Sequence, residues 1–238
     1  MDMLTLNRPL GHAPRRTSPL RCVALGDSLI YGYGDPDGGG WVERLRRQWM
    51  QGGETGHVMY NLGVRGDGVQ QVTQRLEREF RCRGELRHRV PDCIILSVGV
   101  NDSCRVGRAQ GRLFTPPDQF QQAMADLLHQ AQQLCPVLFV GMTPVDEAAM
   151  PFAGCLHYNH ADQRQYNDVI RQACLAHNVP HLNLFEAWLS RGEAWWRSRL
   201  SSDGLHPNTA GYSAILADVH AWPAFTAIFE TDALVERS

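Results

Sequence analysis

The sequence predicts an α/β protein in which a parallel β-sheet is covered by helices on both faces. Short apolar runs alternate with longer segments of helical periodicity along the 238 residues, a rhythm typical of parallel sheets with helical crossovers. The apolar runs are continuous, as expected for strands buried on both faces. Glycine or polar residues follow these runs, so chemically active side chains are expected at the carboxyl edge of the sheet.

Five apolar runs are the expected strands. The clearest is Cys-Ile-Ile-Leu-Ser-Val at residues 93–98, and the first, at residues 21–25, ends directly before Gly26. A run of this length bounded by turn residues favours a buried strand over a helix. In chain order, strands are expected at residues 21–25, 58–62, 93–98, 137–140 and 181–184.

The segments between these strands have the apolar spacing of amphipathic helices. In residues 69–80, for example, Val69, Val72, Leu76 and Phe80 fall on one helical face. The last helix has Pro207 at its first turn, where proline is favoured. In chain order, helices are expected at residues 41–51, 69–80, 118–134, 162–177 and 208–220, and long loops at residues 105–117 and 143–160.

The chain is expected to form one domain. No internal repeat, linker or low-complexity tract divides residues 21–230, and this length suffices for one α/β core. Residues 1–20, with three prolines and three arginines, are expected to form a flexible arm, and residues 231–238 a tail. The arm lacks the uninterrupted apolar stretch of a secretory signal, and no run approaches the length of a transmembrane helix.

The charge and the cysteine content of the chain limit its expected partners and its expected compartment. The formal net charge is −2, which gives no electrostatic footprint for nucleic acid or an anionic membrane. The seven cysteines are scattered and form no CxxC pair, so reduced thiols in a cytoplasmic protein are expected. The oligomeric state cannot be predicted from the sequence.

Two short motifs carry residues suited to nucleophilic catalysis. Gly26-Asp27-Ser28-Leu29 follows the first expected strand, and Asp203-Gly204-Leu205-His206-Pro207 precedes the last expected helix. A serine hydroxyl is a weak nucleophile unless a base lies within hydrogen-bond reach. His206 is the candidate base, and Asp203 can orient its imidazole. The two motifs therefore predict a serine–histidine–aspartate triad.

Acyl transfer also requires hydrogen-bond donors for the oxyanion of the tetrahedral intermediate. Three donors are available in the sequence. They are the backbone N–H of Ser28, a backbone N–H in the turn Gly63-Val64-Arg65-Gly66, and the side-chain amide of Asn101, directly after the clearest strand.

Four segments occur in an order that resembles the GDSL, or SGNH, hydrolase family of esterases, lipases, thioesterases and lysophospholipases. They are Gly26-Asp27-Ser28-Leu29, Asn61-Leu62-Gly63-Val64-Arg65-Gly66-Asp67, Gly99-Val100-Asn101-Asp102 and Asp203-Gly204-Leu205-His206-Pro207. One such tetrapeptide is weak support, whereas four ordered segments after expected strands are strong support. The resemblance covers about residues 21–220.

The resemblance implies a flavodoxin-like three-layer α/β/α sandwich with no metal or cofactor. It also implies Ser28 as the nucleophile, His206 as the base and Asp203 as the residue that orients it. The oxyanion donors would be Ser28, Gly66 and Asn101. Gly63 is a competitor for Gly66, and turn position favours Gly66.

The walls of the substrate pocket are expected to come from residues 29–41, 103–117 and 143–160. Their aromatic side chains suit a small-molecule ester with an apolar or aromatic group; the candidate substrate-binding residues are Tyr31, Tyr33, Phe114, Phe152 and Tyr158. The same loops contain Cys155, His157 and His160, but their spacing is not that of a zinc module. No metal is therefore predicted, and this segment is expected to shape substrate access.

The predicted function is a serine ester hydrolase, of the GDSL esterase or lipase type, that works through an acyl-enzyme. A thioesterase, a lysophospholipase or a carbohydrate O-deacetylase could use the same site. A function of another class, a non-catalytic flavodoxin-like binding module, is disfavoured because all five catalytic positions are filled: Ser28, Gly66, Asn101, Asp203 and His206.

Overall fold

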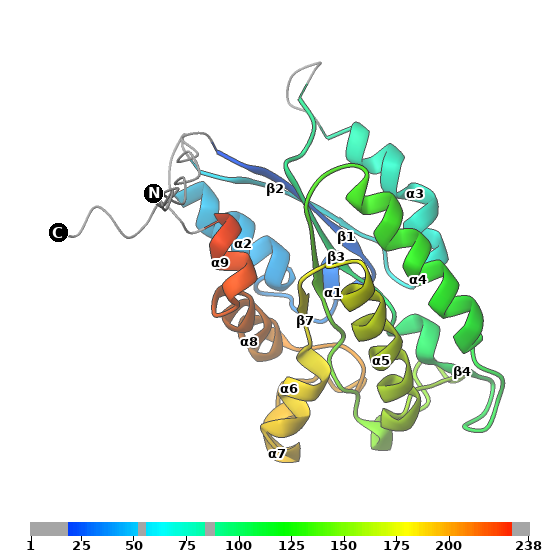
Figure 1. Cartoon of the computed structure of the whole chain (residues 1–238). Helices are drawn as coiled ribbons and strands as arrows, with labels where there is room; N and C mark the ends of the chain where they lie inside the picture. Colours follow the sequence, from blue (N-terminus) through cyan, green and yellow to red (C-terminus); the bar gives the residue numbers. More distant parts are fainter. Residues whose placement is uncertain (1–18, 52–55, 84–88, 230–238) are drawn as a thin grey trace, which may run out of the picture.

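Five parallel strands form the central sheet, in the order β2-β1-β3-β5-β7 (Figure 1). The computed structural model describes residues 19–51, 56–83 and 89–229. In chain order the strands are β1 (Arg21–Gly26), β2 (Val58–Gly63), β3 (Cys93–Ser97), β5 (Val137–Val140) and β7 (His181–Leu182). The first strand is paired on both sides: Cys22 lies opposite Met59 of β2 and opposite Cys93 of β3.

Helices cover both faces of this sheet, so the predicted α/β three-layer fold is confirmed (Figure 1). One layer contains α3 (Val69–Arg81), α4 (Pro117–Gln132) and α5 (His160–Ala176). The other contains α2 (Gly40–Gln51), α8 (Thr209–His220) and α9 (Pro223–Phe229). The described residues also form the α-helices α1 (Ser28–Tyr31), α6 (Leu184–Ser190) and α7 (Glu193–Arg197).

The apolar core is divided in two by the sheet. Val23 and Leu25 of β1 belong to the cluster beneath α3, α4 and α5, whereas Cys22 and Ala24 belong to the cluster beneath α2 and α8. Successive side chains of a strand point to opposite faces. The continuous apolar run in β1 therefore supplies both clusters, as the sequence predicts for a strand buried on both sides.

One expected strand and the two expected long loops differ from the structure. The strand expected at residues 181–184 ends at Leu182, and Leu184 begins α6 because the Asn183 side chain accepts a hydrogen bond from the Glu186 N–H. The two long loops each carry a short strand: β4 (Arg105–Val106) pairs antiparallel with β6 (Leu156–His157). The loops are therefore joined to each other beside the carboxyl edge of the sheet.

The ends of the chain fall mostly outside the described residues. This applies to residues 1–18 of the expected arm and to the expected tail at residues 231–238. Leu20, which the prediction placed in the arm, is buried, and its carbonyl accepts a hydrogen bond from the Val58 N–H. Among the helices of the described residues, none combines the length and apolar character needed to span a bilayer.

Candidate active site

Ser28 is the first residue of α1, immediately after β1 ends at Gly26. Asp27 begins this short helix, because its Oδ1 accepts a hydrogen bond from the Leu29 N–H at 2.9 Å. Tyr212 of α8 holds the turn from the other side. Its hydroxyl donates to the carbonyl of Tyr33 at 2.8 Å and lies 3.3 Å from that of Ser28. The backbone at Ser28 is therefore held by Asp27 at the start of α1 and by Tyr212 of the late helix α8.

His206 brings the two predicted motifs together. Its Nε2 lies 3.0 Å from Ser28 Oγ, and its Nδ1 lies 2.7 Å from Asp203 Oδ2. Burial opposes ionisation of Asp203, but hydrogen bonds from His206 and from two backbone N–H groups outweigh it and lower the pKa of this carboxyl. An ionised carboxylate only accepts hydrogen bonds, so His206 Nδ1 carries the proton and Nε2 is free to accept from the Ser28 hydroxyl.

Two aromatic side chains border the imidazole of His206. The ring centroid of Tyr33 lies 4.6 Å from that of His206, and the ring centroid of Phe152 lies 5.4 Å from it, both in edge-to-face arrangements. Such contacts restrict rotation of the imidazole and keep its surroundings apolar. Both residues were predicted to line the substrate pocket.

The two glycines of the segment Gly63-Val64-Arg65-Gly66 differ in the use of their backbone N–H groups. The Gly63 N–H donates to Asn61 Oδ1 at 3.0 Å, and a Cβ at Gly63 would collide with the Tyr31 backbone. Gly66 has φ +83°, a conformation that favours glycine, and a Cβ there would meet open space. Within the described part of the chain the Gly66 N–H has no acceptor, so this geometry favours Gly66 over Gly63.

Asn101 follows β3 in a short 3₁₀ turn. Its Nδ2 donates to the carbonyl of Asp67 at 2.9 Å, and its Oδ1 lies 3.3 Å from the hydroxyl of Tyr158. An amide nitrogen carries two hydrogens, so one N–H of Asn101 remains for a ligand. Tyr158 was predicted to be a pocket wall, but it is only 2% exposed. The structure thus places it behind Asn101, where it fixes the orientation of the amide.

Arg75 of α3 connects the ends of two strands with the turn at Gly66. Its guanidinium donates to the carbonyls of Gly26 and Leu62, both at 2.8 Å, and to Asp67 Oδ2 at 2.7 Å. The same Asp67 accepts the bond from Asn101 through its backbone carbonyl. One side chain thereby holds the strand end before Ser28 in register with the turn that presents the Gly66 N–H.

Two buried carboxyl groups, those of Asp27 and Asp102, directly neighbour Ser28 and Asn101 in the sequence. Burial raises the pKa of Asp27 to about 7, and its Oδ2 has no hydrogen-bond partner in the described residues. Burial also raises the pKa of Asp102, although Thr115 Oγ1 and the Val69 N–H donate to its two oxygens at 2.7 and 3.0 Å. Asp102 therefore joins the turn at Asn101 to the start of α3, which is a structural role.

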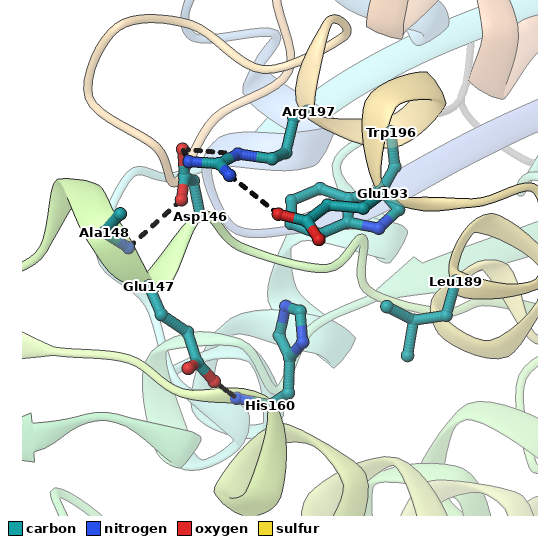
Figure 2. A pocket seen from close by; sticks show the side chains of 8 residues that line it. All are labelled: Asp146, Glu147, Ala148, His160, Leu189, Glu193, Trp196 and Arg197. Atoms are coloured by element: carbon teal, nitrogen blue, oxygen red, sulfur yellow. Dashed lines mark hydrogen bonds and ion pairs between the residues drawn. The ribbon is translucent and has the colours of Figure 1, made fainter.

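A pocket of about 480 Å³ lies beside the loop that carries Asp203, between the segment at residues 146–148 and α7 (Figure 2). Arg197 bridges Asp146 and Glu193 across it. The Asp146 N–H also donates to the carbonyl of Gly204 at 2.7 Å. None of the candidate catalytic residues lines this pocket. Its residue Asp146 contacts the loop that carries Asp203 and His206 through the hydrogen bond to Gly204.

The segment with Cys155, His157 and His160 is spread over several surroundings. His157 lies in β6, Cys155 is exposed, and His160 Nε2 lies 2.8 Å from the carbonyl of Val145. Among the described residues, no three His, Cys, Asp or Glu side chains are grouped as metal ligands would be. Of these three residues, His160 lines the pocket of Figure 2, whereas His157 pairs with Arg105 of β4.

Most of the predicted site residues are close together. Ser28, Asp203 and His206 form one hydrogen-bonded chain. Tyr31 and Phe114 are 53% and 44% exposed, and in the described residues no hydrogen bond or ring contact joins them to that chain. Their part in substrate binding remains a prediction.

The prediction did not include Arg75, Tyr212 or the link from Tyr158 to Asn101. Arg75 and Tyr212 bond to backbone carbonyls, which have no signature in a sequence. A tyrosine 57 residues from its amide partner gives no local signal either.

Known proteins resemble this chain in sequence and in fold. Residues 24–214 match the GDSL-like Lipase/Acylhydrolase family. The human platelet-activating factor acetylhydrolase IB subunit alpha1 is 24% identical over 161 residues, which span 68% of this chain and 62% of the human subunit.

Solved structures share the fold. A lipase/acylhydrolase from Enterococcus faecalis superposes with a TM-score of 0.66 at 21% identity, covering 84% of this chain and 93% of that one. The W215I variant of Axe2, an acetyl xylan esterase from Geobacillus stearothermophilus, gives 0.63 at 18% identity, covering 84% and 92%.

Together the fold and the family match place the chain in the class of GDSL-type lipases and acylhydrolases. The chain belongs to the GDSL-like Lipase/Acylhydrolase family. The resemblance predicted from the four sequence segments is thereby confirmed.

Proposed function

We propose that the protein hydrolyses carboxylic esters through an acyl-enzyme formed on Ser28. The observation that carries this proposal is the hydrogen-bonded chain from Ser28 Oγ to His206 Nε2 at 3.0 Å and from His206 Nδ1 to Asp203 Oδ2 at 2.7 Å. This arrangement has the connectivity of a nucleophile, a base and the group that orients the base.

In the proposed reaction Ser28 Oγ attacks the ester carbonyl carbon while its proton passes to His206 Nε2. The negative charge on the former carbonyl oxygen is stabilised by the N–H groups of Ser28 and Gly66 and by the Asn101 amide. His206 then gives its proton to the departing alcohol. Water, activated by the same imidazole, attacks the acyl-enzyme, releases the carboxylic acid and restores Ser28.

The names of two relatives support a short acyl group. The human relative is an acetylhydrolase subunit and the Geobacillus relative is an acetyl xylan esterase, so both act on acetyl groups by name. The edges of Tyr33 and Phe152 beside His206 favour an apolar or aromatic alcohol. We therefore expect p-nitrophenyl acetate to be a better substrate than esters of graded, longer acyl chains.

The substitution Ser28→Ala tests the mechanism. Turnover of p-nitrophenyl acetate should fall by more than about 10³-fold, the scale seen when a catalytic serine is removed. Ser213→Ala, an exposed serine of α8, is the matched control and should retain the wild-type rate.

A covalent probe gives a second readout. Diethyl p-nitrophenyl phosphate should transfer its diethylphosphoryl group to Ser28 Oγ and release p-nitrophenolate, and peptide mass spectrometry would locate the label. Labelling of a different residue, or equal turnover by wild type and Ser28→Ala, would contradict the assignment of Ser28 as nucleophile.

A further inference from the structure

Arg65 lies at the rim of the candidate active site, one residue before Gly66. Its guanidinium carbon is 3.7 Å from the ring centroid of Tyr33, and the Tyr33 ring is in edge contact with His206. The positive charge of Arg65 is therefore linked to the candidate base His206 through the ring of Tyr33, and it adjoins the candidate oxyanion donor Gly66 in the sequence. The proposed reaction at Ser28 does not use this charge.

Within residues 19–51, 56–83 and 89–229, no hydrogen bond occupies the donors of this guanidinium. Arg65 is exposed, and no carboxylate of the described residues pairs with it. Two carboxylates of this region have other partners, since Asp67 is bound by Arg75 and Asp203 by His206. Stacking on an aromatic ring orients the guanidinium plane while leaving its N–H edge free.

We propose that Arg65 binds an anionic group, a carboxylate or a phosphate, carried by the alcohol portion of the ester substrate. The proposal rests on the ester hydrolase function above. A guanidinium is suited to this ligand class because its parallel N–H groups match two oxygens of a carboxylate or phosphate. The alcohol side is assigned because Tyr33 lies between Arg65 and His206, and His206 protonates the departing alcohol.

The experiment compares esters that differ in one charge. The probes are 2- and 4-acetoxybenzoate, each paired with the neutral and similarly shaped 2- or 4-acetoxybenzamide, and release of the phenol is followed spectrophotometrically. In each case acetyl transfer to Ser28 releases the phenol, and water then releases acetate. The quantity measured is the ratio of kcat/KM for the benzoate to that for its benzamide.

For Arg65→Gln this ratio should fall about two- to fivefold relative to wild type, the scale of an exposed ion pair. Arg65→Lys should lose less, because the charge remains without the planar fork. The wild-type ratio should also approach that of Arg65→Gln in 1 M salt, where exposed charges are screened. Arg81→Gln removes a charge at the opposite end of α3, about 18 Å along its axis, and should leave the ratio unchanged.

A ratio that is the same in wild type and Arg65→Gln for both positional isomers would overturn the proposal. This outcome is distinct from failure of the ester hydrolase function, because Arg65→Gln would still hydrolyse the benzamides while Ser28→Ala would not. Calorimetric titration of 4-acetoxybenzoate into Ser28→Ala, with and without Arg65→Gln, tests the binding contact independently of turnover. Equal affinities in the two proteins would also overturn it.

Discussion

Asp203 acts on its own loop as well as on the imidazole. Its Oδ1 accepts hydrogen bonds from the N–H groups of Leu205 and His206 at 2.9 and 3.0 Å, while its Oδ2 is bound to His206 Nδ1. A single carboxylate therefore fixes both the backbone and the ring of the candidate base. The spacing of three residues between Asp203 and His206 makes this double contact possible.

The amide of Asn101 depends similarly on one neighbour. Tyr158→Phe should lower kcat for p-nitrophenyl acetate by about three- to tenfold with little change in KM, because loss of one neutral hydrogen bond costs about 1 kcal/mol and here would let the amide turn from the oxyanion. Asn101→Ala should cost about 10²-fold in kcat, the scale of one oxyanion donor.

The double variant separates positioning from packing. If Tyr158 acts through Asn101, adding Tyr158→Phe to Asn101→Ala should cause no further loss of kcat. Independent, multiplicative losses in the double variant would show that the hydroxyl has another role.

At the scale of elements, α3 organises the edge of the sheet where the candidate site lies. Arg75, at the middle of this helix, donates to the carbonyl of Gly26 at the end of β1 and to that of Leu62 near the end of β2. At the start of the helix, the Val69 N–H donates to Asp102. The helix therefore fixes the turns at Gly66 and Asn101 relative to each other through polar contacts at its start and middle, while its apolar face packs on the core.

Removal of the Arg75 side chain should affect stability and catalysis together. Arg75→Met should lower the free energy of unfolding by about 1–3 kcal/mol, because part-buried carbonyls and Asp67 lose their charged donor. It should also lower kcat, because the Gly66 turn is released. Urea denaturation and steady-state kinetics measure the two effects.

Arg81→Gln is the matched control on the same helix. Among the described residues Arg81 pairs with Glu77 alone, and both side chains are more than half exposed, so the loss should be below about 1 kcal/mol. A similar loss of stability in the two variants would contradict the bridging role of Arg75.

At the scale of the whole molecule, burial of Asp27 should make stability depend on pH. Its pKa is raised by burial to about 7 in the folded state, whereas an unfolded chain ionises near the ordinary value of about 4. Between these values the folded state holds a proton that the unfolded state has lost. Stability contributed by Asp27 is therefore present at low pH and is lost as pH rises from about 4 to about 7.

The substitution Asp27→Asn should remove this dependence and still offer an oxygen to the Leu29 N–H. The difference in unfolding free energy between variant and wild type should change in favour of the variant by up to about 1.4 kcal/mol per pH unit across this range. Urea denaturation from pH 4.5 to 7.5 would measure it. Parallel curves for the two proteins would show that Asp27 titrates normally in the fold.

Much of the fold was predictable because it depends on local patterns. The apolar run of β3 and the spacing of Val69, Val72 and Leu76 in α3 indicate their elements without knowledge of the rest. The short helix α6 was not predictable, since Leu184 is buried either as a strand residue or as a helix residue. Its start is decided by the Asn183 cap, which competes with a strand of only two residues.

In the candidate site, too, the residues that lie in local motifs were predictable and those that act through tertiary contacts were not. Ser28, Asp203 and His206 could be selected because each lies in a motif whose spacing suits its chemistry. Arg75 could not, because its contacts to Gly26 and Leu62 are to backbone oxygens brought together only by strand pairing. Arg65 lay within a recognised segment, but its contact with Tyr33 depends on the turn and on α1 folding against each other.

The hydrogen bond between Ser28 and His206 joins residues 178 positions apart, and Tyr212 of α8 holds the same turn. Neither half of the chain can contribute the proposed chemistry alone. During refolding, enzymatic activity should therefore return only after the late segment has docked on β1, even if the sheet and its apolar layers form earlier. Recovery of turnover would thus report completion of folding more faithfully than recovery of helical signal.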